Sequence, residues 1–379
     1  MKKLLALVLT LAMVAGMLTV GASAEAGTIK IGMIGPLTGG AAVYGTAVAR
    51  AAQIAVDEVN ALGGVQFELN CQDDEHDAEK SVSAYNSLKD WGMQMLCGTV
   101  TTKPCLAVGP EANEDRIFMV TPSASAADVA YTGDNVFQIC FIDPAQGKIS
   151  AEVIAEKSLG SKIGIIYDSS DVYSTGIMES FVEEAEALSL EIVCSEAFTG
   201  DTKADLTTQV TKCKESGAEL VFLPIYYTEA SNILSYANQI GYAPLFFGVD
   251  GMDGILDVDG FDTSLAEDLH MLTPFAADAK DERTAAFVAK YKELYNGEVP
   301  NQFGADAYDV IWAMYQAAVA AGLDGSESNE EICDAMIAQF TSMTYDGITG
   351  AGMTWDEDGF VSKDGSVVKI QNGAYVSVE

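Results

Sequence analysis

The stretch Thr28-Ile-Lys-Ile-Gly-Met-Ile34, followed by Gly35-Pro-Leu-Thr-Gly-Gly40, decides the fold class of this chain. The short apolar run is typical of a buried strand, and the glycine-rich run after it is typical of a turn. Apolar residues then recur at helical spacing from Ala47 to Leu62, and this pattern stops at Gly63-Gly64. A strand, a glycine turn and a helix in this order predict the first unit of an α/β sheet. Such a turn places free backbone amides at a helix N-terminus, where an anion can bind.

The first 24 residues have the features of a secretory signal. Lys2 and Lys3 precede an apolar run from Leu4 to Val20, and Ala22-Ser23-Ala24 fits a cleavage site. An uncleaved membrane anchor is the alternative, but the run is short for the ~20 residues that a transmembrane helix needs. No cysteine lies at the cleavage point, so the signal is not that of a lipoprotein. We therefore expect export to the periplasm or to the outer face of the cell envelope, where soluble nucleotides are scarce, and hence a different small anionic ligand.

The composition excludes several classes of partner. The 379 residues hold 56 acidic and 20 basic side chains, with a net charge of −36, and loss of the signal removes two more lysines. Nucleic acids and anionic lipids need a cationic surface, so neither is an expected partner. The seven cysteines include no CxxC pair, and their odd number leaves at least one without an intramolecular partner; we interpret them mainly as buried free thiols. With only His76 and His270, a zinc cluster is not expected, and the acidic run around His76 is interpreted as a solvated loop.

Short apolar strands alternate with amphipathic helices along most of the mature chain. This succession runs twice, with a join near Ile142-Asp143-Pro144, and it predicts two doubly wound, mostly parallel α/β sheets. Three helices without intervening strands are then expected at 281–295, 303–321 and 329–340. The tail from Met353 has short strands separated by Asp-Gly and Asn-Gly turns, which is typical of hairpins. Two lobes with late segments that cross back between them suggest a hinged cleft.

Ligand sites in open α/β sheets lie at the carboxyl ends of the strands. Hydroxyls, tyrosines and one carboxylate follow the predicted strands here, whereas the three arginines of the chain fall elsewhere. Hydroxyls and free amides at helix starts can accept a carboxylate, an aspartate can pair with an ammonium group, and tyrosines supply walls with a polar tip. The set therefore suits a zwitterion. Its members are Tyr44, Thr101, Thr102, Ser123, Ser125, Tyr173, Tyr226 and Asp250.

Each of these residues also has an ordinary structural interpretation. The two threonines could cap a helix, the two serines could form a turn, and Asp250 could form an Asx-turn before Gly251. The tyrosines could be boundary aromatics. The shared position at strand ends is the stronger evidence for a site. The chain has no GxSxG, GxxxxGK[ST] or HExxH motif, so neither an enzyme nor a cofactor is expected.

The chain resembles the type I periplasmic binding proteins of branched-chain amino-acid ABC transporters, and the resemblance covers nearly all of the mature chain. It rests on Ile31-Gly-Met-Ile-Gly-Pro-Leu-Thr-Gly39 and on Asp57-Glu-Val-Asn-Ala-Leu-Gly-Gly64. It continues in Met119-Val-Thr-Pro-Ser-Ala-Ser125, in Ile165-Ile-Tyr-Asp168 and in Gly248-Val-Asp-Gly251. Together these motifs are specific for the family and the fold, and less specific for the ligand.

The resemblance implies roles for the residues at the strand ends. The ligand carboxylate would meet the Thr102 hydroxyl, with Thr101 as the neighbouring alternative, and the backbone of the Ser123-Ala124-Ser125 segment. Asp250 would pair with the α-ammonium group, where leucine-type members often carry a glutamate. Tyr44, Tyr173 and Tyr226 match the aromatic wall. Some members carry a disulfide in the first lobe, and His76 and Thr101 stand at the corresponding positions here.

The resemblance also implies an organisation and a function. A first lobe of residues 25–142 plus 274–345 and a second lobe of 143–273 plus 346–379 would be joined by three crossovers, near Phe141–Pro144, Leu272–Phe275 and Tyr345–Thr349. The protein would be a monomer that captures leucine, isoleucine or valine and delivers it to the permease of an ABC importer. A sensor module for another amino acid, amide or organic acid is the alternative, and a secreted α/β hydrolase or amidase is a third.

Overall fold

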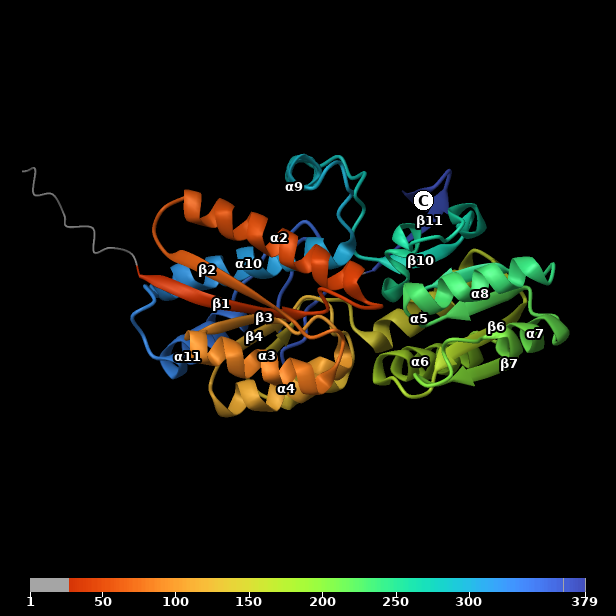
Figure 1. The fold of residues 1–379 in the computed structure, drawn as a ribbon, viewed down its shortest axis with the longest axis horizontal. Coiled ribbons are helices and arrows are strands. Elements are labelled where there is room, and N and C mark those ends of the chain that lie inside the picture. The colour runs from red at the N-terminus through yellow and green to blue at the C-terminus, as the bar shows by residue number, and fades with distance from the viewer. Residues whose placement is uncertain (1–26, 364, 379) are drawn as a thin grey trace, which may run out of the picture.

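Two α/β lobes lie side by side along the longest axis of the computed structural model (Figure 1). The structure describes residues 27–363 and 365–378, so the predicted signal peptide at 1–24 lies outside the described residues. The predicted fold class, two lobes with mostly parallel sheets, is confirmed. Among the described residues, no helix combines the length and the apolar character that crossing a membrane requires.

The first lobe contains a five-stranded parallel sheet in the order β2-β1-β3-β4-β5. β1 lies between β2 and β3, and five of its last six residues are buried, as the continuous apolar run predicts. The chain order reverses between β1 and β3, so the carboxyl ends of these two strands flank a crevice. The strands are β1 (Thr28–Gly35), β2 (Gln66–Asp73), β3 (Met95–Gly98), β4 (Phe118–Thr121) and β5 (Val136–Gln138).

Helices cover both faces of this sheet. Figure 1 shows α2 and α10 together on one face and α3 and α4 on the other. Residues close in sequence set both ends of α3. At its start, the Asp77 side chain accepts hydrogen bonds from two free amides, and at its end Gly92 has a positive φ of 92°. The helices of this lobe are α2 (Ala42–Ala61), α3 (Ala78–Trp91), α4 (Thr102–Glu114), α9 (Glu282–Leu294), α10 (Gln302–Ala321) and α11 (Asn329–Phe340), with the 3₁₀ turn η1 (Ala127–Thr132).

The second lobe contains a seven-stranded sheet in the order β12-β11-β10-β9-β8-β6-β7. Its first five strands in the sequence are parallel, and the last two form the predicted antiparallel hairpin. Asn372 and Gly373 make the hairpin turn with φ values of 54° and 72°, the left-handed conformation that an Asn-Gly pair favours. The strands are β6 (Lys162–Asp168), β7 (Glu191–Phe198), β8 (Leu220–Leu223), β9 (Leu245–Gly248), β10 (His270–Thr273), β11 (Ser366–Gln371) and β12 (Ala374–Ser377).

The helices of the second lobe connect its parallel strands. α7 and α8 pack into the core on one face of the sheet, and α5 and α6 pack into the core on the other. Several of these helices begin directly after a strand end, which brings their first turns to the edge that faces the other lobe. They are α5 (Asp143–Glu156), α6 (Val172–Ala187), α7 (Thr207–Glu215) and α8 (Tyr227–Gln239), with the 3₁₀ turns η2 (Asp250–Met252), η3 (Ile255–Asp257) and η4 (Thr263–Ala266).

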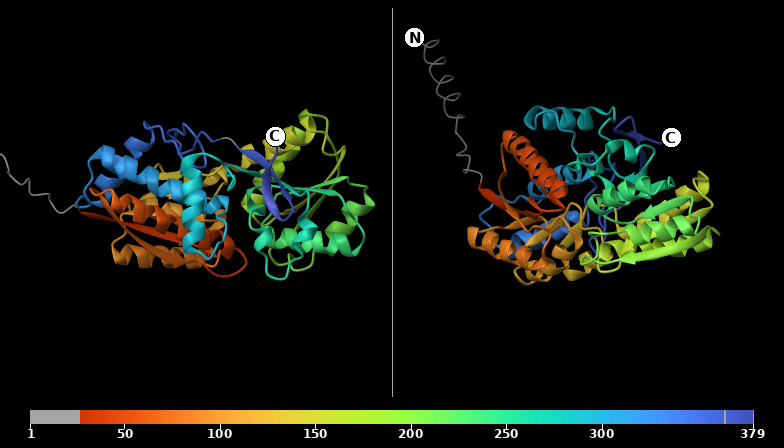
Figure 2. Two further views of the ribbon diagram at one scale, coloured as in Figure 1. Left: turned by 90° about the horizontal axis from the view of Figure 1, so that it is seen from above. Right: turned by 45° about the vertical axis from the view of Figure 1, so that its right-hand side comes forward.

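The chain passes between the lobes three times: between β5 and α5, after β10, and just before β11. Figure 2 shows the C-terminal hairpin on the second lobe and the blue segment that precedes it on the first. The third crossover differs from the one implied at Tyr345–Thr349. The Trp355 indole donates to the carbonyl of Gln138 in β5 (2.8 Å), and the Gln138 amide donates to the carbonyl of Gly359 (3.0 Å). Residues 346–360 therefore pack on the first lobe, because the buried Trp355 ring joins the core there. The crossing follows Lys363, whose ammonium group binds Asp306 of α10, and precedes β11.

Candidate functional site

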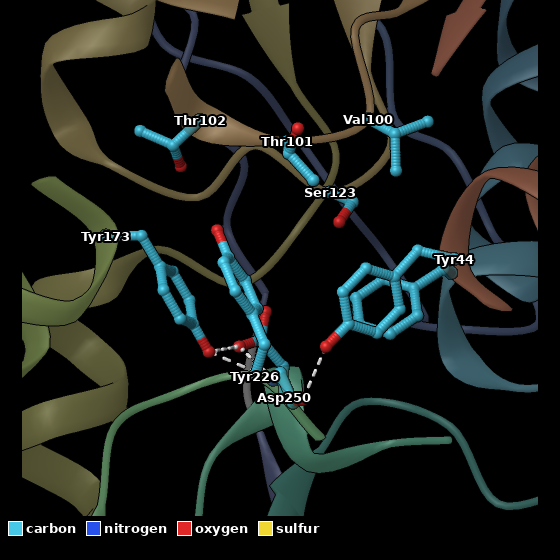
Figure 3. Close-up of a pocket in the computed structure, with 10 residues that line it drawn as sticks. Tyr44, Val100, Thr101, Thr102, Ser123, Tyr173, Tyr226 and Asp250 are labelled. Carbon is cyan, nitrogen blue, oxygen red and sulfur yellow. Dashed lines mark hydrogen bonds between the residues drawn. The ribbon is translucent and has the colours of Figure 1, made fainter. Parts of the chain in front are cut away.

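The strand ends of the two lobes meet around one small cavity (Figure 3). Seven of the nine residues expected at the ligand site line it, and they come from both lobes. Val100, Gly251 and Phe303 also line it and were not among the expected residues. The seven are Tyr44, Thr101, Thr102, Ser123, Tyr173, Tyr226 and Asp250.

Hydroxyl groups form the first-lobe side of the cavity. Thr102 opens α4, Ser123 follows β4, and Figure 3 shows both hydroxyls pointing toward the cavity. The hydroxyl of Thr101 points away from it and lies 2.8 Å from Nδ1 of His76. Thr101 occupies the N-cap position of α4 without a capping hydrogen bond, so the simple helix-cap interpretation of its side chain does not hold. A threonine–histidine hydrogen bond stands where the resemblance places a disulfide in other members.

Ala124 and Ser125 lie behind the lining. The amides of Ser123 and Ala124 both donate to the Thr121 hydroxyl (3.2 and 2.9 Å), which ties this turn to the end of β4. The Ser125 carbonyl accepts from the amide of Asp143 (3.0 Å). The Ser123 amide, which the resemblance implied as a ligand contact, is therefore already hydrogen-bonded inside the lobe. What this turn presents to the cavity is the Ser123 side chain.

Asp250 is the acidic group of the second-lobe side. It follows β9 and is 3% exposed. Its Oδ1 accepts from the Tyr173 hydroxyl (2.7 Å) and from the amide of Gly251 (2.7 Å). Its own amide donates to Oε1 of Gln146 (3.1 Å), and its carbonyl accepts from the side chain of Gln302 (3.1 Å). Tyr173 and Gly251 thus hold the carboxyl group beside the cavity, and Gln146 and Gln302 hold the Asp250 backbone.

The position of Asp250 changes its acidity. Burial raises its pKa to about 7, although hydrogen bonds from Tyr173, Gln146 and the Gly251 amide favour the charged form. Taking a carboxylate out of water is costly unless a positive charge accompanies it. Asp250 is therefore suited to receive a cationic group, and an ammonium group in the cavity would lower this pKa again.

Aromatic rings form the remaining walls. Tyr44 lies in the first turn of α2, and its ring centroid is 4.4 Å from that of Phe303 and 5.7 Å from that of Tyr226. Tyr226 stacks on Tyr173 with centroids 4.9 Å apart and an angle of 6° between the planes. Burial raises the pKa of Tyr44, Tyr173 and Tyr226 well above the usual value, so all three hydroxyls stay protonated. The walls are apolar surfaces with hydroxyl tips.

The lobes are closed on each other. The Tyr44 hydroxyl donates to the Gly251 carbonyl (2.5 Å), and the Thr228 hydroxyl donates to the Gly40 carbonyl (2.9 Å). Gln302 of α10 also donates to Asp250 and Asp253, so several hydrogen bonds join the lobes at the cleft. The free volume of the cavity is about 10 Å³, which is room for about one water molecule. A ligand as large as an amino acid requires the lobes to separate or the Tyr226 ring to move.

Two lining residues, Phe303 and Val100, were not predicted from the positions that follow strand ends. Val100 follows β3 by two residues and is adjacent to the expected Thr101, so the rule could have included it. Phe303 lies in the first turn of α10, which follows another helix and not a strand. Its place in the wall depends on the packing of α10 against α2. That packing is a tertiary contact, and no local pattern near residue 303 indicates it.

A second, larger cavity of about 920 Å³ lies between α2, α9 and the hairpin strands of the other lobe. Its lining includes Arg50 and Glu298, which already form an ion pair with each other. It also contains a buried carboxyl group, Asp253, but this group accepts a hydrogen bond from the Gln302 amide (2.9 Å), and the strand-end hydroxyls of Thr102 and Ser123 line the smaller cavity. The smaller cavity is therefore the better candidate for a zwitterion.

The acidic run around His76 has structural roles. Asp73 accepts from the Thr38 hydroxyl (2.6 Å) and the Leu37 amide (2.8 Å), and Asp77 caps α3. Burial, with Lys203 and Lys103 nearby, lowers the pKa of His76 to about 4, so its ring is neutral. Within residues 27–363 and 365–378, no group of three or more His, Cys, Asp or Glu side chains is placed to hold a metal ion.

Comparison with known proteins identifies the family. A family model described as "Periplasmic binding protein" matches residues 28–374, and the chain belongs to this family. It is 26% identical over 343 residues to the leucine-, isoleucine-, valine-, threonine- and alanine-binding protein of Pseudomonas aeruginosa, covering 89% of this chain and 88% of the relative. It is 32% identical over 239 residues to Leu/Ile/Val-binding protein homolog 3 of Brucella melitensis, covering 62% of this chain and 64% of that protein.

A solved structure supports the same assignment. The branched-chain amino acid transporter substrate binding protein LivJ from Streptococcus pneumoniae, in complex with isoleucine, superposes with a TM-score of 0.84. The two sequences are 28% identical, and the superposition covers 93% of this chain and 99% of LivJ. The similarity therefore extends over both lobes and the cleft between them. The resemblance stated from the sequence motifs is confirmed.

Proposed function

We propose that this protein is the extracytoplasmic substrate-binding component of an ABC importer, and that it captures a free α-amino acid between its lobes. Leucine, isoleucine and valine are the proposed ligands. The proposal includes export to the periplasm, action as a monomer, delivery to a permease and no catalytic activity. The relatives named above support the transport role, since each is named as a binding protein for amino acids of this kind or as the binding component of such a transporter.

The observation that carries the proposal is the buried carboxyl group of Asp250 across the cavity from the hydroxyls of Thr102 and Ser123. An α-amino acid has an ammonium group and a carboxylate one carbon apart, so it can satisfy both sides at once. Asp250 would accept from the ammonium group, and the hydroxyls would donate to the carboxylate. The N-terminus of α4 adds a favourable field for a negative charge.

The side chain of the ligand would lie among the rings of Tyr44, Tyr226 and Phe303 and the methyl groups of Val100. These surfaces are apolar and suit an aliphatic group. Each buried methylene contributes about 0.8 kcal/mol of transfer free energy. A branched aliphatic side chain would therefore bind more tightly than that of glycine or alanine, and a charged side chain would be excluded because nothing on this wall would pair with it.

Closure of the lobes would couple binding to transport. The ligand would enter while the lobes are apart, and the contacts of Tyr44 with Gly251 and of Thr228 with Gly40 would form as they close. Closure removes water from the charged groups, so their pairing strengthens in the lower dielectric. The closed surface is then the form that a permease would recognise.

Isothermal titration calorimetry tests the proposal. The mature chain is titrated with leucine, isoleucine, valine, glutamate, lysine, benzoate and the amide of leucine. We expect saturable binding of the three branched amino acids. Leucine amide should bind at least about tenfold more weakly, because it lacks the carboxylate that the hydroxyls bind. Binding of benzoate but of no amino acid would overturn the assignment of the ligand class.

A further inference from the structure

Two cysteines of the second lobe meet on one side of its sheet. Cys194 lies in β7 and Cys213 lies in α7, and their Sγ atoms are 2.9 Å apart. β7 is one of the two edge strands of the seven-stranded sheet, and the Cys194 side chain is half-buried, so reagents in solution can reach it. Cys213 is buried beneath it. All seven cysteines lie within the described residues, and each is a free thiol there.

A β-bulge turns Cys194 toward α7. Ile163 of β6 pairs with Ile192, but the next residue, Gly164, pairs with Cys194, so Val193 is the extra residue in β7. Ile192 packs into the core on one face of the sheet, whereas Val193 and Cys194 both pack into the other core, which contains Cys213. Without the bulge, successive side chains would alternate between the faces. The bulge thus places the Cys194 thiol on the same side as the helix.

Gly164 leaves the space that the two sulfur atoms occupy. A Cβ atom at this position would lie 2.9 Å from Sγ of Cys194 and 3.1 Å from Sγ of Cys213. Both distances are too short for ordinary carbon–sulfur contacts, so any larger residue would push the thiols apart. Three features of the chain, a bulge, a glycine and a buried partner thiol, therefore combine to bring these two sulfur atoms together.

We propose that Cys194 and Cys213 form a reversible disulfide that joins α7 to the edge strand β7 in the oxidising environment to which the protein is exported. A disulfide needs its sulfur atoms about 2.05 Å apart, so a movement of less than 1 Å from the observed distance is enough. The oxidant is a disulfide, either of low molecular weight or on a protein. Exported proteins encounter such oxidants, whereas cytosolic thiols are kept reduced.

The reaction is a pair of thiol–disulfide exchanges. The Cys194 thiolate attacks one sulfur of the oxidant RSSR, forms a mixed disulfide and releases RS⁻. Cys213 then loses its proton and attacks the Cys194 sulfur, which releases the second RS⁻. The two cysteines lose two electrons and two protons, and RSSR gains them as two molecules of RSH. The hydrogen bond between the two thiols lowers the pKa of Cys194 to about 7, which favours Cys194 as the attacking group.

The disulfide would stabilise one edge of the second lobe. It would close the loop that contains the end of β7 and the start of α7, and a covalent loop restricts the unfolded chain more than the folded one. Neither cysteine lines the ligand cavity, so ligand affinity should not change. The bond would therefore affect stability and leave binding unaltered.

Thiol counting and peptide mapping test the proposal. The full mature protein is reduced, freed of reductant and incubated with oxidised glutathione, and thiols are then titrated in denaturant. We expect seven thiols before oxidation, as the sequence provides, and two fewer afterwards. A proteolytic digest should contain the Cys194 peptide linked to the Cys213 peptide. The oxidised form should also melt at a higher temperature than the reduced form, and dithiothreitol should reverse both changes.

Two variants sharpen the result. Cys213→Ser should stop at the mixed disulfide and carry one glutathione on Cys194. Cys71→Ser, a half-buried cysteine of the first lobe, serves as the matched control and should still form the link. Retention of all seven thiols in the folded wild-type protein would overturn the proposal. So would a stable glutathione adduct on Cys194 with Cys213 still free, or a link between any other pair. These readouts use the wild-type chain and do not depend on how well either variant folds.

Discussion

The hydroxyl of Tyr44 in the first lobe donates a 2.5 Å hydrogen bond to the carbonyl of Gly251 in the second lobe. Gly251 directly follows Asp250, so this contact joins the opposite lobe to the segment that carries the acidic group of the site. A Cβ atom on Gly251 would lie 2.4 Å from the Tyr173 hydroxyl, which explains why glycine is needed here. The segment Asp250-Gly251 thus takes part both in closure of the lobes and in placement of the carboxyl group.

Removal of the Tyr44 hydroxyl should weaken closure. Tyr44→Phe keeps the ring and its packing on Phe303 but loses the interlobe hydrogen bond. We expect leucine to bind about 5- to 10-fold more weakly, since a buried hydrogen bond contributes roughly 1 kcal/mol and the Gly251 carbonyl is left unpaired. Calorimetry measures the affinity. Small-angle X-ray scattering should show a larger radius of gyration for the unliganded variant.

A tyrosine far from the cleft provides the control for this change. Tyr131→Phe removes the same hydroxyl from a side chain that is 65% exposed, and it should leave affinity and scattering unchanged. Equal affinities for Tyr44→Phe and the wild type would show that the hydrogen bond does not contribute to closure.

Neutralising Asp250 should abolish most of the affinity. Asp250→Asn keeps the size of the side chain but removes the charge that would pair with the ammonium group. A hydrogen bond to a charged group contributes about 1.5–3 kcal/mol, so we expect binding to weaken by about 10- to 100-fold. Asp262→Asn changes the net charge equally at a surface turn and should bind normally. A leucine-induced rise in melting temperature that persists undiminished in Asp250→Asn would contradict the role of this residue.

Affinity should depend on pH because Asp250 has a pKa of about 7 in the unliganded site. An ammonium ligand needs the charged carboxylate, so it lowers this pKa and binding below pH 7 releases a proton. Affinity should therefore rise between about pH 5.5 and 7.5, by at most about tenfold per pH unit, and then level off. Titrations in two buffers of different ionisation enthalpy measure the released proton.

Other titratable groups lie near the site, among them Asp171 and Asp306, whose pKa values burial raises to about 6, and His76, which a histidine variant tests. His76 has a pKa near 4, well below the window, so His76→Gln should keep the same pH profile. If this variant lost the dependence, or if wild-type affinity were constant from pH 5.5 to 7.5, Asp250 would not be the group that controls binding.

The third crossover contains a buried ion pair whose loss should destabilise the protein. Nζ of Lys363 is 2.5 Å from Oδ1 of Asp306 and 2.7 Å from the Thr349 hydroxyl, and the Lys363 side chain is fully buried. Lys363→Met leaves Asp306 buried without a counter-charge, and we expect a loss of about 3–5 kcal/mol in the free energy of unfolding. Urea denaturation measures this change.

Two further variants test whether the loss of stability comes from the unpaired charge of Asp306. The double variant Lys363→Met/Asp306→Leu removes both charges and should recover most of the stability. Lys290→Met breaks an exposed pair with Glu293 and should change the stability by less than about 1 kcal/mol. A Lys363→Met protein as stable as the wild type would show that the pair is not required at the crossover.

Local patterns predicted much of the fold. The apolar run of β1 and the Asn372-Gly373 turn each act through neighbouring residues, and each appears as expected. The third crossover was placed too early. Its position depends on the Trp355 indole finding the Gln138 carbonyl, 217 residues away in the sequence. A contact between residues so far apart produces no pattern in the sequence around either of them.

The residues of the site also divide into those that local patterns predicted and those that tertiary packing decided. The sequence alone determined that hydroxyls, tyrosines and Asp250 stand at strand ends, because parallel strands bring their carboxyl ends to one edge. Tertiary structure alone decided that Phe303 joins the wall, that Ser125 lies behind it, and that Thr101 turns its hydroxyl to His76. It also decided that Cys194 meets Cys213. Strand ends follow from short-range patterns, whereas side-chain contacts depend on how distant elements pack.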